Sequence, residues 1–206
     1  LKCQTMKHIQ LTIKLISVFI LPILLNSCGG DLEGTFYISD EARKYQIDTT
    51  ITKMQFVDNF GISEEFYIDQ NIWYITHHYY SEWGTDGEAW GETFGVAYNS
   101  TVNGFFFMFV LRADVENTDL EIEWNQRDRL VYNFGTKAIE SGVNANIKFY
   151  DTLTVRGIKY QDIIEIDYTE KINEIDNDTP VKTYISGNKG LIKFERKDKI
   201  ILERIE

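Results

Sequence analysis

The sequence contains little cysteine, proline and histidine, and each shortage excludes something. The 206 residues include two cysteines and two prolines. Cys28 is the only cysteine after Met6, so no disulfide can form within the rest of the chain. The roughly 180 residues that follow must therefore bury a core without that support, and their length suits one domain. Pro180 is the only proline after Cys28, which permits long strands with uninterrupted hydrogen bonding.

Histidine is too scarce for most catalytic or metal sites. His8 lies close to the start, and His77 and His78 are the only others. Adjacent residues of a strand point to opposite faces, so these two cannot readily bind one metal. No Gly-x-Ser-x-Gly, P-loop or dinucleotide-binding motif occurs either. The sequence therefore predicts no catalytic residue and no histidine metal site.

Basic residues are outnumbered by acidic ones. The chain has 21 Lys and Arg against 32 Asp and Glu, for a net charge of −11. Without residues 1–27, which carry three lysines, the charge is about −14. Such a chain is repelled by nucleic-acid phosphates, so nucleic acid is excluded as a partner.

A short apolar run near the start has the pattern of an export signal. Reading from Met6, Lys7 and Lys14 precede an uncharged run at residues 15–25. That run is about half the roughly 20 residues that a membrane-spanning helix needs. A basic start, a short apolar run and small residues before a cut form a secretory signal, predicted for residues 1–27.

The end of this segment, LNSC at residues 25–28, resembles a bacterial lipobox. The resemblance implies that the chain is cut before Cys28 and that Cys28 carries fatty acyl chains, such as palmitate. Residues 28–35 then form a lipidated tether and residues 36–206 a β domain. Gly29 favours the outer membrane, on either its periplasmic or its surface side. The alternative is an ordinary secretory signal.

Most of the remaining sequence alternates between apolar and polar residues, as strands do. The clearest strand is 146–156, where Ile147 and Phe149 fall on one face and Lys148 and Tyr150 on the other, so we expect it to be half-buried. Ser39 is expected to cap one short helix at 39–45. The other expected strands are 51–57, 65–68, 72–80, 93–98, 105–111, 120–124, 129–134, 158–168, 181–185, 191–195 and 200–205.

These strands follow one another too closely for crossover helices, so they must pair antiparallel. The sequence predicts a mainly β fold with a single antiparallel β domain and one short N-terminal helix. Two architectures remain open, an open half-barrel and a sandwich.

Two segments, 150–160 and 184–194, resemble a scheme found in uncharacterised lipoproteins of Bacteroidetes. They contain Gly157-Ile158-Lys159-Tyr160 and Gly190-Leu191-Ile192-Lys193-Phe194. The resemblance implies an antiparallel β domain behind a lipid anchor, and it carries no catalytic residue.

Thr49 and Thr152 each follow an aspartate, and these pairs resemble the sites that Bacteroidetes O-glycosylate on exported proteins. The alternative is that Asp-Thr pairs are common in turns and strands.

Aromatic residues are concentrated between positions 72 and 98. Trp83 and Trp90 flank a loop that contains Asp86 and Glu88. Aromatic faces beside carboxylates suit sugar rings, so this segment is a candidate glycan-binding site. The alternative is that these aromatics fill a β core.

Residues 105–111 are apolar without interruption, so both faces of this strand should be covered. One face can line the core, and the other needs a second layer or an apolar cavity. A cavity lined by Phe105, Phe107 and Phe109 could hold an acyl chain. The alternative is the central strand of a sandwich.

Two acidic loops offer oxygen ligands for Ca²⁺, although neither follows the EF-hand pattern. They contain Asp86, Glu88 and Glu92, and Glu174, Asp176 and Asp178. The sequence predicts no bound metal, with Ca²⁺ as the one cofactor to consider.

The leading expectation is a non-enzymatic envelope lipoprotein that binds a lipid or another hydrophobic ligand. A surface glycan-binding lipoprotein that uses residues 72–98 is the alternative. A hydrolase built on two carboxylates is a second alternative.

Overall fold

The structure is a computed structural model that describes residues 34–82, 85–101, 104–113, 117–171 and 179–205. Side chains at 68–89 and at 171 lie outside this description. The chain divides into two compact units, one of residues 1–34 with 77–89 and one of residues 35–76 with 90–206. The side chains that the structure describes belong to the second unit.

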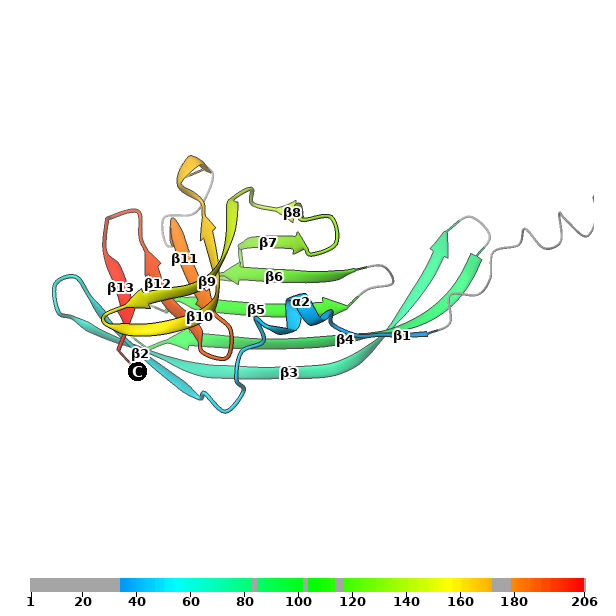
Figure 1. Cartoon of the computed structure of the whole chain (residues 1–206), viewed down its shortest axis with the longest axis horizontal. Helices are drawn as coiled ribbons and strands as arrows, with labels where there is room; N and C mark the ends of the chain where they lie inside the picture. Colours follow the sequence, from blue (N-terminus) through cyan, green and yellow to red (C-terminus); the bar gives the residue numbers. More distant parts are fainter. Residues whose placement is uncertain (1–33, 83–84, 102–103, 114–116, 172–178, 206) are drawn as a thin grey trace, which may run out of the picture. The chain divides into compact units, whose positions relative to one another are not determined.

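The described elements are almost all strands, as Figure 1 shows. The helical elements are α2 (Asp40–Arg43) and η1 (Thr169–Lys171). The strands are β1 (Gly34–Phe36), β2 (Lys53–Asp58), β3 (Ser63–Glu82), β4 (Thr85–Ser100), β5 (Phe106–Ala113), β6 (Thr118–Trp124), β7 (Asp128–Asn133), β8 (Ala138–Gly142), β9 (Asn146–Val155), β10 (Ile158–Asp167), β11 (Lys182–Ser186), β12 (Gly190–Glu195) and β13 (Ile201–Arg204).

The strands form one sheet in the order β8-β7-β6-β5-β4-β3-β2-β13-β12-β11-β10-β9, with β1 paired to β4. Strands β2 to β8 and strands β9 to β13 are two meanders, joined where β13 pairs antiparallel with β2. Strands β8 and β9 end this order, yet only residues 143–145 connect them along the chain. The predicted mainly β, antiparallel fold is confirmed. It is one continuous open sheet, which matches the half-barrel alternative and not the sandwich.

The sheet curls until distant strands face one another across an aromatic core. The ring of Trp124 on β6 lies 5.5 Å from the ring of Phe194 on β12. Phe194 also contacts Phe56 at 5.7 Å and Phe66 at 5.9 Å. All four side chains are fully buried. Rings from β2, β3, β6 and β12 thus meet in one cluster, so this face of the sheet is its inner face.

The short N-terminal helix is confirmed, with Ser39 as its cap. The Ser39 hydroxyl accepts a hydrogen bond from the Ala42 amide at 3.3 Å. Ala42 is completely buried in the main core. We call residues 38–47, which contain α2, the strap. Its ends Ile38 and Ile47 are also buried in that core, so the strap packs against the inner face of the sheet.

Strand β9 lies where the sequence predicts it but is more exposed than expected. It pairs with β10 on one side and ends the strand order on the other. Seven of its ten residues are exposed, including Phe149 at 37% and Tyr150 at 39%. The predicted apolar face is covered only in part, at Ile147, Leu153 and Val155, because alternation fixes which side chains share a face but not how fully another layer covers it.

The turn between β9 and β10 lies against β13. Arg156, at this turn, is 3.8 Å from the Glu203 carboxylate of β13. Val155 and Tyr160 pack with Ile163 and Ile192 in a small buried cluster separate from the main core. The β9–β10 hairpin therefore buries a second, smaller apolar surface, and its turn contacts β13.

Candidate functional site

The strap begins at a buried carboxylate on β4. Glu92 is 6% exposed, and its Oε2 accepts a hydrogen bond from the Ile38 amide at 3.0 Å. The same oxygen lies 2.6 Å from the Arg43 guanidinium. The Ser39 amide donates to the Thr118 hydroxyl at 2.9 Å. These contacts fix the start of the strap to β4 and β6, and the ion pair compensates the burial of the Glu92 charge.

The middle of the strap packs on aromatic rings from both ends of the sheet. Tyr45 stacks on Phe134 at 5.9 Å and lies 5.4 Å from Phe149 of β9. Tyr132 of β7 lies 5.5 Å from Phe149. Burial, with the nearby Asp162 charge, raises the pKa of Tyr45 to about 12, so its phenol is neutral at pH 7. Side chains from β7, β9 and the strap thus meet at one aromatic group. We call Tyr45, Tyr132, Phe134 and Phe149 the seam cluster.

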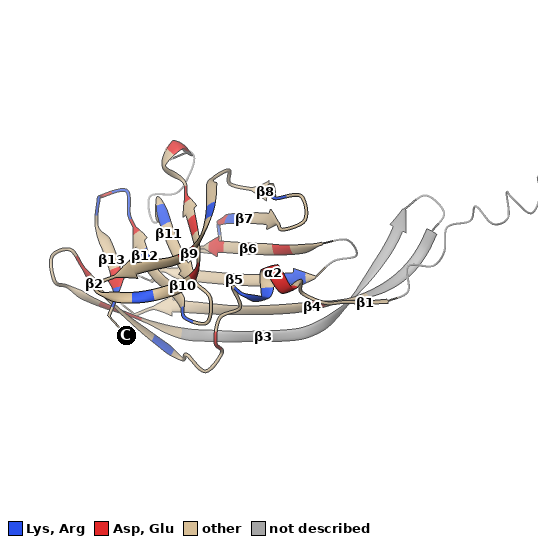
Figure 2. Cartoon of the chain, in the orientation of Figure 1, with Lys and Arg blue, Asp and Glu red and all other residues tan. Residues whose placement is uncertain are grey.

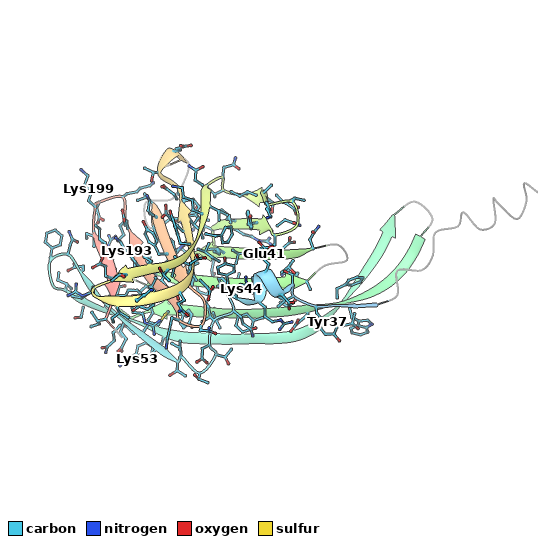
Figure 3. The ribbon with its side chains drawn as sticks, viewed as in Figure 1. Tyr37, Glu41, Lys44, Lys53, Lys193 and Lys199 are labelled. Atoms are coloured by element: carbon cyan, nitrogen blue, oxygen red, sulfur yellow. The ribbon has the colours of Figure 1, made fainter. Side chains whose placement is uncertain are left out.

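The end of the strap is tied to the β11–β12 turn. The Asn188 amide donates to the Gln46 carbonyl at 2.9 Å, and the Asp48 amide donates to the Asn188 carbonyl at 3.2 Å. A Cβ atom at Gly187 would lie 2.1 Å from the Lys44 carbonyl oxygen, so glycine is required for this approach. Figure 3 labels Glu41 and Lys44 on this segment. The strap therefore runs from β4 and β6, past the seam cluster, to the β11–β12 turn.

The three phenylalanines predicted to line an apolar cavity lie on the inner face, where other aromatic rings pack against them. Phe107 and Phe109 are completely buried, and Phe105 is 4% exposed. Phe107 lies 4.9 Å from Trp124, and Phe105 lies 6.1 Å from Phe194. The outward-facing Phe106 and Met108 of the same strand are half-buried. The inner face of β5 is thus packed with aromatic rings.

The structure describes one of the two tryptophans proposed for glycan binding. Trp90 is 45% exposed on β4, whereas Trp83 lies outside the described residues. The histidines of the sequence prediction, His77 and His78, have side chains outside the described residues.

Of the carboxylates considered for Ca²⁺, only Glu92 is described, and Arg43 contacts it. The side chains of Asp86 and Glu88 lie outside the description, as do residues Glu174, Asp176 and Asp178. Among the described residues, no group of three or more metal-ligating side chains comes together.

Two other buried carboxylates are likewise compensated by cations. Glu121 lies 2.7 Å from Arg129 and 3.5 Å from Arg112. Glu165 accepts a hydrogen bond from the Tyr150 hydroxyl at 2.9 Å and lies 3.8 Å from Lys148. Both groups have the character of structural ion pairs, since each charge is neutralised at the surface of the sheet.

Both threonines considered for O-glycosylation are exposed, Thr49 after the strap and Thr152 on β9. Cys28 lies outside the described residues.

Within the part of the chain that the structure describes, no helix is both long and apolar enough to span a membrane.

The described part of the chain is thus an open antiparallel sheet with the strap packed against its inner face. Comparison with protein-family models, with curated proteins and with solved structures finds no match to this chain.

Sequence reasoning missed the residues that hold the strap. Glu92 was considered as a calcium ligand, but its partner is Arg43, 49 positions earlier. Tyr45 and Phe134 were not singled out, because nothing in a single sequence pairs a helix end with the far edge of a sheet. The one available signal was the burial implied by Ala42 and Tyr45 on the same side of a short helix.

Proposed function

We propose that this protein is a lipid-anchored envelope protein that binds an apolar ligand, such as an acyl chain, between the strap and the inner face of the sheet. The anchor is Cys28, and the lipobox-like residues 25–28 support it. The outer membrane is the proposed location, supported by Gly29 after the cysteine.

The exposure of Phe149 carries this proposal. This ring belongs to the seam cluster, yet 37% of its surface is exposed. Its neighbours Tyr132 and Phe134 are 7% and 5% exposed. An exposed aromatic ring continuous with a buried aromatic group gives an apolar chain a point of entry. Covering it would gain roughly 25 cal/mol for each Å² of apolar surface removed from water.

The strap is the part of the proposed site that would have to move to admit a ligand. It is held at its two ends by hydrogen bonds and the Arg43–Glu92 ion pair, and in its middle by ring contacts through Tyr45. An acyl chain that replaces the Tyr45 ring against Phe134 and Phe149 would keep the apolar surface covered. The exchange keeps Phe134 and Phe149 covered, and its cost is the exposure of the Tyr45 ring, which is 9% exposed in the structure.

The test is native mass spectrometry of the full chain, purified from cells with its membrane lipids available. We expect a co-purifying mass in the range of a lipid or fatty acid. Phe149→Ser should reduce its occupancy several-fold. Ile158→Ser is the matched control, because Ile158 is 41% exposed but lies outside the seam cluster. A protein without any bound apolar mass, or equal loss in both variants, would count against the proposal.

The anchor needs its own measurement. Mass spectrometry of the protein extracted from membranes should find an acylated Cys28 as the first residue, and Cys28→Ser should move the protein to the soluble fraction. A soluble wild-type protein that begins elsewhere would refute the anchor while leaving the ligand proposal standing.

Glycan binding is the second candidate, and the exposure of Trp90 favours it. A tryptophan with 45% of its surface in water gives a sugar ring an aromatic side chain to contact. A glycan array with the wild-type protein and Trp90→Ala tests this function. Binding that Trp90→Ala abolishes and Phe149→Ser leaves unchanged would place glycan binding ahead of the apolar ligand.

A further inference from the structure

The turn between β2 and β3 exposes two large apolar side chains. Phe60 is 73% exposed and Ile62 is 64% exposed. Among the large hydrophobic residues that the structure describes, Phe60 has the highest exposed fraction, and Ile62 shares the second highest with Tyr37. A single exposed apolar residue is ordinary, but two within three positions of one turn make a local apolar projection. We call residues 58–62 the apolar turn.

The backbone of the apolar turn is fixed from within. Oδ1 of Asp58 accepts hydrogen bonds from the Phe60 amide at 2.8 Å and from the Ile62 amide at 2.7 Å. The Gly61 amide donates to the Asp58 carbonyl at 3.1 Å, and Gly61 has φ +89°, where glycine is favoured. Asp58 itself is 9% exposed. Phe60 and Ile62 are therefore held outward by a rigid turn, at little entropic cost to a partner.

A turn rich in cations lies beside it. The Ile201 amide donates to the Asn59 side chain at 3.1 Å, which joins the β12–β13 turn to the apolar turn. The β12–β13 turn contains Arg196, Lys197 and Lys199 with one acidic residue, Asp198. Figure 2 shows this turn as basic, and Figure 3 labels Lys199 on it. Lys199 is exposed, whereas Arg196 is engaged by Asp198 at 2.9 Å.

We propose that the apolar turn is a membrane-contact site, at which Phe60 and Ile62 insert into the interface of a lipid bilayer while Lys199 meets anionic headgroups. A Cβ atom placed at Gly61 would have no atom within 4 Å, so space around the turn is open. Rigid apolar side chains that project from a convex turn fit a deformable lipid surface better than a preformed protein pocket. Cations beside them, in a chain of net charge −11, complement lipid phosphates.

This site is separate from the proposed ligand site, because no residue of the strap or the seam cluster belongs to it. It also does not depend on acylation of Cys28. A protein that exchanges a lipid with a membrane would use such a contact, but the contact stands on its own observations.

The test is flotation with vesicles, using the full chain carrying Cys28→Ser so that an acyl anchor does not dominate. Vesicles of phosphatidylcholine with a minority of phosphatidylglycerol serve as the probe. We expect the protein to float with the vesicles, and Phe60→Ser with Ile62→Ser to lower its partition at least about tenfold. Ile158→Ser is the matched control and should leave the partition unchanged.

A second variant tests the role of charge. Lys199→Glu should weaken partition several-fold on vesicles that contain phosphatidylglycerol and should have no effect on pure phosphatidylcholine. Circular dichroism and urea unfolding test whether the variants are folded. We expect them to be folded, because the four substituted positions, 60, 62, 158 and 199, are all exposed. The proposal would be overturned if the protein did not bind the vesicles, or if Phe60→Ser with Ile62→Ser left the binding unchanged.

Discussion

The Oε2 atom of Glu92 lies 2.6 Å from the guanidinium of Arg43, and this pair joins the strap to β4. The two residues are unequally placed, because the Glu92 side chain is 7% exposed and the Arg43 side chain is 40% exposed. The buried partner also accepts the Ile38 amide at 3.0 Å. Glu92 therefore supports both the start of the strap and its helix.

Replacing Glu92 should weaken the strap. We expect Glu92→Gln to lower the free energy of unfolding by about 1–2 kcal/mol, since a buried charge-assisted bond is lost and Arg43 remains partly solvated. Urea unfolding followed by circular dichroism measures this change. Glu140→Gln is the control, because Glu140 is exposed and should change stability by less than about 0.5 kcal/mol. Equal effects of the two substitutions would contradict the role of Glu92.

Phe194 should be among the most costly residues to truncate. It is completely buried and contacts Trp124, Phe56 and Phe66. We expect Phe194→Ala to destabilise the fold by about 3–5 kcal/mol, because it removes a large ring and leaves a cavity. The same change at Phe60, which is 73% exposed, should cost less than about 0.5 kcal/mol. Urea midpoints of the two variants test the prediction, and a small effect at Phe194 would argue against the described core.

The ionisation of Tyr98 should make the free energy of unfolding depend on pH in the alkaline range. Its ring is fully buried, its hydroxyl has no hydrogen-bond partner among the described residues, and burial raises its pKa from 10.0 to about 12. The folded state thus favours the neutral phenol. Its contribution is complete below pH 10 and is lost as pH rises from 10 to 12, up to about 2–3 kcal/mol.

Tyr98→Phe tests this linkage. We expect unchanged or slightly higher stability at pH 7, because the substitution removes an unpaired buried hydroxyl. The loss of stability between pH 10 and pH 12 should also be smaller than in the wild type. Urea unfolding across this pH range is the measurement. Parallel pH curves for the two proteins would show that Tyr98 does not titrate as described.

The two Asp-Thr pairs lead to a prediction about modification. If Thr49 and Thr152 are O-glycosylated, the protein isolated from its own host should exceed its sequence mass, and Thr152→Ala should remove one glycan. Both threonines are exposed, so an enzyme can reach them. Intact-protein mass spectrometry decides the question, with Thr154→Ala, on the same exposed strand, as the control.

Local pattern predicted most of the sheet because alternation and turn residues are local properties. The strand expected at 105–111 is β5 (Phe106–Ala113), and the helix cap at Ser39 is as expected. Two expected strands, 65–68 and 72–80, fall within the single long strand β3. Strand β8 (Ala138–Gly142) was missed, since four of its five residues are exposed and give no apolar signal.

The candidate site was harder to predict because it depends on contacts between distant segments. Phe105, Phe107 and Phe109 were found from their apolar run. The strap was not, because its partners Glu92, Phe134 and Asn188 follow it by tens of residues and come from three separate parts of the sheet. Only the curling of the sheet brings these three residues to one segment, and no local pattern encodes that curvature.

The junction of β2 with β13 has a consequence for how the chain folds. Along the sheet order, every other described neighbour is also the next strand in sequence, so those pairings can form as local hairpins. Asn59 and Ile201, which meet at the junction, are 142 positions apart. Closing so long a segment is entropically unfavourable and slow, although the cost rises only with the logarithm of its length. We therefore expect the two meanders to form early and their union at β2 and β13 to set the rate of folding.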